Sequence, residues 1–184
     1  MIGEESELLS SKPLGGKHTM NMKDIYFKLR APLPTPADEI CQCRGQKPVK
    51  LMTALGENPV HCIDCNLEVS PEVLGFDTNL VEMIADWRSV YDAVDRLWLD
   101  SGEYESWAEC ELSDIQSPIN VRGLKVRDAL NEIRRCYFWF FQDQSQDDFT
   151  SITLCPSCQE PLIPYDHGIF PQLICEKCSI ITVG

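Results

Sequence analysis

The sequence predicts an α+β protein in which a central helical hairpin lies between two cysteine-based modules. Close cysteine pairs occur near both ends of the chain, and a region of helical periodicity separates them. Short alternating or apolar stretches flank the cysteine pairs, as is typical of strands. We therefore expect three structured segments, with the first cysteine module and its strands in 23–75, helices in 76–145, and the second cysteine module in 150–184.

The N-terminal residues carry little structural signal before the first strand. Residues 1–22 are polar, contain a Gly-Gly pair and show no period, which predicts a disordered leader. An added remnant, or a start at Met20 or Met22, would account for them equally well. Residues 24–30 alternate apolar and polar side chains, which predicts a half-buried strand.

The middle of the chain predicts helices. Residues 78–99 form the clearest one, capped by Asp77 or Thr78 and ended near Gly102, because apolar residues recur on one face at Leu80, Ile84, Trp87, Tyr91, Val94 and Trp98.

Further along, 103–112 predicts a short helix, 117–120 a turn, and 122–142 a third helix that includes a run of aromatic residues. The two long helices are expected to pair as an antiparallel hairpin, since each needs a partner for its apolar face. Cys110 and Cys136 are predicted to be buried thiols on these helices.

The C-terminal cysteines give the strongest signal. Two CxxC pairs, Cys155–Cys158 and Cys175–Cys178, are separated by sixteen residues, and this spacing suits two tight turns joined by a hairpin around one tetrahedral zinc ion. The sequence therefore predicts a zinc ribbon in 150–184. Gln159 and Ser179 stand where such turns favour a residue that tolerates positive φ. A redox dithiol at Cys155–Cys158 is an alternative.

A second group of cysteines predicts a second structural zinc ion nearer the N-terminus. Its members form a CxC pair, Cys41 and Cys43, and a CxxC pair, Cys62 and Cys65. His61 is adjacent and could replace a cysteine, although we expect it to be a bystander. A site shared between the N-terminal and C-terminal pairs is a further alternative.

Two resemblances arise at these residues. The CxC…CxxC order of Cys41, Cys43, Cys62 and Cys65 looks like the zinc switch of the redox-regulated heat-shock chaperone, in which oxidation ejects zinc and unfolds the domain. Two cysteine-pair modules flanking a helical middle also resemble small bacterial double-CxxC zinc-ribbon proteins, some of which act as toxin-immunity proteins. This second resemblance implies a bacterial protein that is not an enzyme.

Composition and charge disfavour some classes of function. The net charge is −13, and it divides into +2 for residues 1–50 and −15 for residues 51–184. Because a phosphate backbone is bound mainly by Lys and Arg, a nucleic-acid-binding role is the less favoured alternative. Residues 1–21 lack the apolar core of a signal peptide, and the longest apolar run, 136–141, is too short to cross a bilayer. We therefore expect a cytoplasmic protein with no membrane partner.

Catalytic motifs are absent from the sequence. It has three histidines and contains no HExxH, GxSxG, P-loop or GxGxxG motif, and a four-cysteine zinc site has no open position for a substrate. We expect no enzymatic activity and identify no small-molecule substrate.

The acidic middle of the chain suggests a docking surface instead. Residues 77–111 carry ten acidic side chains against two arginines, which suits a basic protein partner in an immunity or adaptor role. We predict that the surface includes Asp86, Asp92, Asp95 and Trp139. A nucleic-acid-binding zinc ribbon and a thiol redox switch are the alternative functions, and a solvated helix face is the plain structural explanation of the charge.

Overall fold

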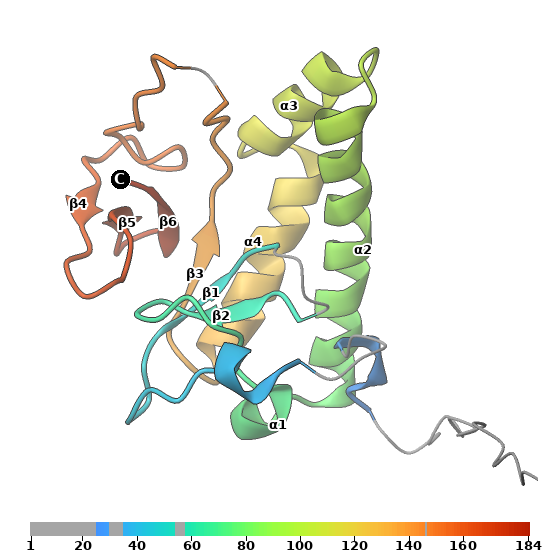
Figure 1. The fold of residues 1–184 in the computed structure, drawn as a ribbon, viewed down its shortest axis with the longest axis vertical. Helices are drawn as coiled ribbons and strands as arrows, with labels where there is room; N and C mark the ends of the chain where they lie inside the picture. The colour runs from blue at the N-terminus through green and yellow to red at the C-terminus, as the bar shows by residue number, and fades with distance from the viewer. Residues whose placement is uncertain (1–24, 30–34, 54–57, 146) are drawn as a thin grey trace, which may run out of the picture.

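The computed structural model describes residues 25–29, 35–53, 58–145 and 147–184, and it consists of one sheet with helices packed on one face (Figure 1). Helices and strands both contribute, so the predicted α+β class is confirmed. The predicted leader, 1–22, lies outside the described residues. The helices are α1 (Pro71–Leu74), α2 (Thr78–Asp100), α3 (Glu105–Ser113) and α4 (Pro118–Asn131), with the 3-10 helices η1 (Phe27–Leu29) and η2 (Ala37–Glu39) before them.

The six strands form one sheet in the order β2-β1-β3-β6-β5-β4. They are β1 (Val49–Leu51), β2 (Val60–Cys62), β3 (Cys136–Trp139), β4 (Ile163–Pro164), β5 (Gln172–Cys175) and β6 (Ile180–Val183). Strand β3 runs parallel to both of its neighbours, β1 and β6, whereas the outer pairs are antiparallel. The sheet therefore joins the two cysteine-bearing parts of the chain through β3.

Helix α2 begins and ends close to the predicted positions. The Asp77 side chain accepts a hydrogen bond from the Leu80 N–H at 2.8 Å and so caps the first turn. The predicted apolar face faces the core, with Trp87 and Tyr91 both buried. Gly102, with φ of 67°, follows Ser101, the C-cap residue of the helix.

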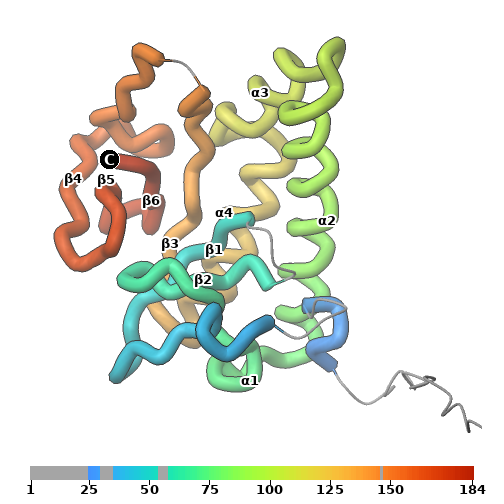
Figure 2. Tube along the Cα trace, in the orientation of Figure 1, coloured from blue at the N-terminus to red at the C-terminus, as the bar shows by residue number. Residues whose placement is uncertain are grey.

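Helix α4 runs back along α2, so the two long helices do form an antiparallel pair, with α3 joining them at one end (Figure 2). Residues 117–120 were predicted to be a turn, and this was wrong, because they begin α4. Ser117 caps the helix by accepting from the Asn120 N–H, and Pro118 occupies the first helical position, where its missing N–H costs nothing.

The predicted third helix over 122–142 was wrong in its second half, where the structure has β3. Helix α4 ends at Asn131, whose side chain bonds both the N–H and the C=O of Cys136 and so turns the chain into the strand. Phe138 faces the helices and Tyr137 the opposite side of the sheet, and both are buried. A strand buried on both faces is apolar throughout, and this pattern does not distinguish it from a buried helix.

The predictions for residues 24–30, for Cys110 and for Cys136 were also wrong, in whole or in part. In place of a strand at 24–30, the described residues 25–29 form a turn followed by η1, with Leu29 buried and Ile25 and Phe27 exposed. Because two of the three apolar residues face solvent, the alternation did not mark the face of a sheet. Cys110 is an exposed thiol on α3, and Cys136, although buried as expected, lies on β3.

Close packing of α4 against the sheet depends on a glycine. A Cβ atom on Gly123 would lie 2.3 Å from Phe138 Cε2 and 2.7 Å from Trp87 Nε1. The rings of Phe138 and Trp87 meet edge to face beside it, with centroids 6.1 Å apart. Within the described residues, no helix has the length and apolar character needed to cross a membrane.

Candidate metal centres

The cysteines form two separate groups of four. The Sγ atoms of Cys41, Cys43, Cys62 and Cys65 lie within 4.8 Å of one another, and so do those of Cys155, Cys158, Cys175 and Cys178. Each group combines the two pairs that are adjacent in sequence, so the alternative of a site shared between the two ends of the chain is not what the structure shows. All ten cysteines are free thiols, and either group could hold a metal ion.

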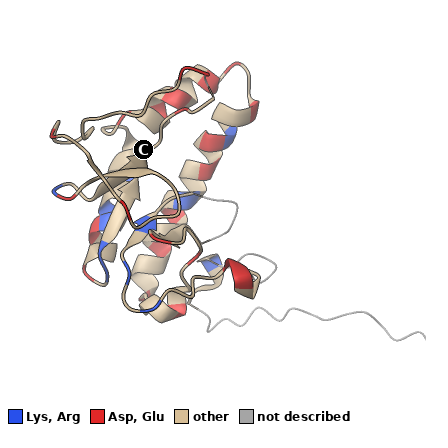
Figure 3. Ribbon diagram, turned by 60° about the vertical axis from the view of Figure 1, so that its left-hand side comes forward, with Lys and Arg blue, Asp and Glu red and all other residues tan. Residues whose placement is uncertain are grey.

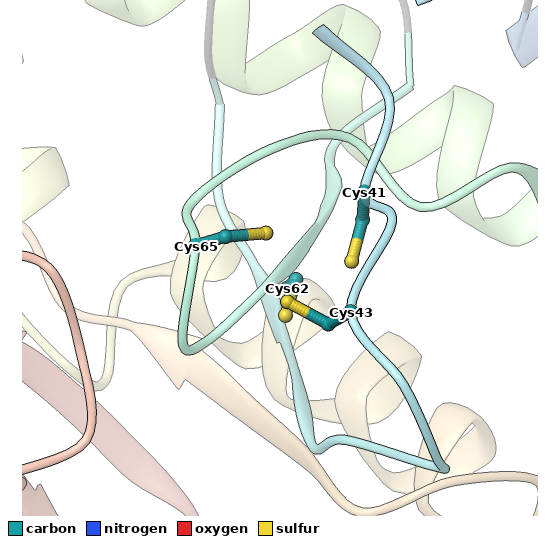
Figure 4. A group of neighbouring side chains, drawn as sticks. All are labelled: Cys41, Cys43, Cys62 and Cys65. Carbon is teal, nitrogen blue, oxygen red and sulfur yellow. The ribbon is translucent and has the colours of Figure 1, made fainter. Parts of the chain in front are cut away.

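The first group is built on the end of β2. Cys62 closes a tight turn in which its C=O accepts from the Asn66 N–H at 3.0 Å, and its N–H donates to the Leu67 C=O at 2.9 Å. The segment with the CxC pair runs alongside this turn, fixed by the Cys41 N–H donating to the Glu68 C=O at 2.7 Å. As a result the four sulfur atoms point toward a common centre (Figure 4).

The second group is built from two similar turns. In the first, the Cys155 N–H donates to the Glu160 C=O and the Gln159 N–H donates to the Cys155 C=O. In the second, between β5 and β6, the Cys178 N–H points at the Cys175 sulfur at 3.4 Å. Cys155 and Cys175 are buried, so the centre of the group is shielded from solvent.

Backbone conformation marks all three CxxC turns. Among the described residues, the non-glycine residues with positive φ are Asn66 (61°), Gln159 (61°) and Ser179 (49°), and each directly follows the second cysteine of a CxxC pair. Left-handed conformations are costly for residues with a Cβ atom and concentrate where function demands a fixed geometry. Gln159 and Ser179 depart from the glycine that is common at these positions and still take the positive φ that the turn favours, and in the CxC turn Gly45 takes a comparable conformation, with φ of 80°.

The thiols of each group differ in how readily they ionise. The hydrogen bond with Cys65 and burial raise the pKa of Cys43 to about 11, and burial raises the pKa of Cys155 to about 12. The backbone N–H of Glu160 lowers the pKa of Cys158, and the N–H of Leu67 with the neighbouring thiols lowers that of Cys65 against the effect of its burial. Four clustered thiols do not all lose their protons unless a cation compensates the charge, which a divalent metal would do.

The two groups are linked through the turn between Cys62 and Cys65. The Asp64 carboxylate in that turn accepts from the Tyr165 hydroxyl at 2.5 Å and pairs with Lys47 at 2.9 Å. Its backbone C=O accepts from the Ile169 N–H at 2.9 Å. These contacts dock the first turn on the loop between β4 and β5, so the two cysteine modules are in direct contact. The sequence held no signal for this, because Asp64 and Tyr165 are far apart along the chain.

The remaining predicted site residues have distinct positions. His61 does not belong to the first cysteine group, and its Nδ1 lies 3.1 Å from the Asn66 C=O, so it is the bystander we expected. Asp92, Asp95 and Trp139 line a single cavity, whereas Asp86 is exposed on α2 outside it. Their role in binding a partner stays a prediction.

Comparison of the chain with models of protein families, with curated proteins and with solved structures finds no significant match.

Proposed function

We propose that this chain is a non-enzymatic zinc-binding interaction protein. Two structural zinc ions hold the two cysteine modules in shape, and the acidic face of α2 docks a basic protein. The observation that carries the zinc part of the proposal is the convergence of two complete cysteine tetrads in one fold.

The donor set and the geometry support zinc as the metal. Four thiolates in a tetrahedral arrangement are a common structural zinc site, with Zn–S distances of about 2.3 Å and hence sulfur–sulfur distances of about 3.8 Å. The Cys158 and Cys175 sulfurs lie 3.7 Å apart. The hairpin of β5 and β6 and the paired turn at Leu154 and Pro161 surround the second tetrad in the manner of a zinc ribbon.

A structural rather than catalytic role follows from the ligand number. A catalytic zinc ion keeps one coordination position for water or substrate, and a four-cysteine site has no such position. The strands beside the tetrads are short, with three residues in β2 and four in each of β5 and β6. Strands of this length bury little surface, so metal binding would supply much of their stability.

The docking part of the proposal is supported by charge. Between Thr78 and Ser113 the chain has nine acidic residues and two arginines, and acidic side chains predominate on α2 and α3 (Figure 3). A surface of one sign of charge speeds association with an oppositely charged partner and selects against acidic ones.

Native mass spectrometry of the purified protein, compared with its denatured mass, tests the zinc part. Two zinc ions per chain are expected, whereas a single zinc ion, bound iron or disulfides would contradict it. The docking part is tested by measuring how strongly the metal-loaded protein binds a basic protein and, separately, duplex DNA. Both measurements are repeated over a series of salt concentrations. Retention of the basic protein alone is expected, and salt-sensitive retention of DNA would favour nucleic-acid binding instead.

A further inference from the structure

A cavity of about 550 Å³ opens beside α2, at the end of β1 and β3. This volume is within the range of pockets that bind ligands. The residues that line it include four aromatic and two acidic ones, Tyr91, Trp98, Trp139, Phe141, Asp92 and Asp95. These residues come from α2, from β3 and from the segment that follows β3, so the fold assembles the cavity from parts that are distant in sequence.

The two carboxylates of the cavity differ in what they contact. Asp92 forms an ion pair with Arg88, one turn earlier on α2, at 2.9 Å. No hydrogen bond or ion pair within the described part of the chain ends on Asp95, which is half-buried in the wall. Burial, and next the charge of Asp92, raise the pKa of Asp95. The cavity therefore holds a carboxyl group for which the described residues provide no cationic partner.

The aromatic rings of the cavity add a second feature that favours a cation. Trp98 and Phe141 meet edge to face with centroids 4.8 Å apart, which fixes both rings in the wall. The Trp139 ring packs with Tyr137 on the face of the sheet away from the helices, where the Lys50 ammonium already lies 4.7 Å from its centroid. The aromatic part of the site therefore rests on Tyr91, Trp98 and Phe141. Aromatic faces and a carboxylate within one recess are the features that bind a cation by charge and by cation–π attraction together.

We propose that this cavity binds one arginine side chain of a basic protein partner, with the guanidinium on Asp95 and against the aromatic wall. The proposal rests on the proposed docking function and specifies where and how the partner is held. Arginine fits better than lysine because its planar guanidinium stacks on rings, pairs with a carboxylate through two N–H groups and is more weakly hydrated.

The test uses the full-length, metal-loaded protein and two capped tripeptides, Gly-Arg-Gly and Gly-Lys-Gly, each with an acetylated N-terminus and an amidated C-terminus. Tryptophan fluorescence and NMR of the indole N–H groups report on the cavity directly, because Trp98 and Trp139 line it. Saturable binding of the arginine peptide, with the lysine peptide weaker by about threefold or more, is expected. Equal affinity for tetramethylammonium would show a general small-cation site and overturn the proposal.

Two isosteric substitutions distinguish binding in the cavity from attraction by the overall negative charge of α2. Asp95→Asn should weaken binding of the arginine peptide by about tenfold, since it removes a charge-assisted hydrogen bond. Asp86→Asn removes the same charge from an exposed position on the same helix and should change the affinity by less than about twofold. Asp95→Glu should recover part of the loss, and unchanged metal content with a melting temperature no lower than that of the parent would show that the variants fold. Equal losses of affinity for the arginine peptide from Asp95→Asn and Asp86→Asn would refute binding in the cavity.

The outcomes distinguish this proposal from the docking function on which it rests. If a basic protein binds the parent and loses affinity equally in the Asp86→Asn and Asp95→Asn variants, that result supports the docking function and contradicts arginine binding in the cavity. If the arginine peptide binds with the expected selectivity and no basic protein does, the cavity chemistry stands and the docking function fails.

Discussion

Replacing Gly123 by alanine tests the packing of α4 against β3, because two opposing effects can be compared in size. Alanine is the better helix former and would stabilise a free helix by about 1 kcal/mol. In the folded protein the added methyl group would lie 2.3 Å from Phe138 Cε2 and 2.7 Å from Trp87 Nε1. Phe138 is completely buried, so its ring has no free space to move into, and a clash of this kind costs about 3 kcal/mol, at the upper end for an overpacked core.

The cost of the clash exceeds the gain in helix propensity, so Gly123→Ala should lower the free energy of unfolding by about 2 kcal/mol. For a chain of this length, a loss of that size corresponds to a fall in melting temperature of about 4 to 8 °C. Urea and thermal unfolding followed by circular dichroism measure both quantities. The free zinc concentration has to be equal in all samples, because metal that binds only the folded state raises its apparent stability.

Two further variants make the test specific to this contact. Lys125→Ala, exposed on the same helix, should change the stability by less than about 0.5 kcal/mol. In a Phe138→Leu background the cost of Gly123→Ala should fall by at least about 1 kcal/mol, because the smaller side chain leaves room for the methyl group. A stabilising effect of Gly123→Ala, or a cost that the Phe138→Leu background leaves unchanged, would refute the close approach of α4 and β3.

Three other outcomes are expected. Cys62→Ala and Cys158→Ala should each lower the metal content from two ions to one in native mass spectrometry, because the tetrads are separate; loss of both ions from one substitution would show that neither site forms alone. Tyr165→Phe should lower the free energy of unfolding, measured in urea, by about 1 kcal/mol, because it removes the hydrogen bond to Asp64. Tyr104→Phe, on the exposed surface, should have no effect. Equal effects of the two substitutions would exclude a special role for the Tyr165–Asp64 bond. Asp95→Asn should be more stable than the parent at pH 7. The raised pKa means that the native state holds this proton more tightly than the unfolded state, so stability falls as pH rises from the ordinary carboxyl value of 3.8 through the raised one. The advantage of asparagine should therefore shrink as the pH is lowered within the range where metal content is constant, and an advantage independent of pH would contradict this origin.

The cysteine groups could be predicted because their information is local. A tight turn with two thiols and a residue at positive φ is encoded in five or six consecutive residues, as in Cys155 to Gln159. Helix α2 could be predicted for a similar reason, since its apolar face and its Asp77 cap are read from neighbouring turns. In both cases the physical constraint acts over a short stretch of chain.

Strand β3 could not be predicted, because what makes it a strand lies elsewhere. Its partners are β1, where Val49 pairs with Cys136, and β6, where Ile180 pairs with Phe138. Both partners are distant in sequence, and neither is visible in the composition of 136–141. The cavity beside α2 was equally hidden: Asp92, Asp95 and Trp139 were each singled out, but nothing local indicates that Tyr91 and Phe141 complete the same recess.

The position of β3 suggests how the two proposed metal centres and the proposed docking cavity would depend on one another. Its neighbours in the sheet, β1 and β6, belong to the two cysteine modules, and its C-terminal residue, Trp139, lines the cavity. Loss of the ion proposed for either module would weaken a short neighbouring strand, and one edge of β3 would then become unpaired. The aromatic wall of the cavity would then lose its fixed shape, so partner binding should require both metal ions even though neither ion touches the partner.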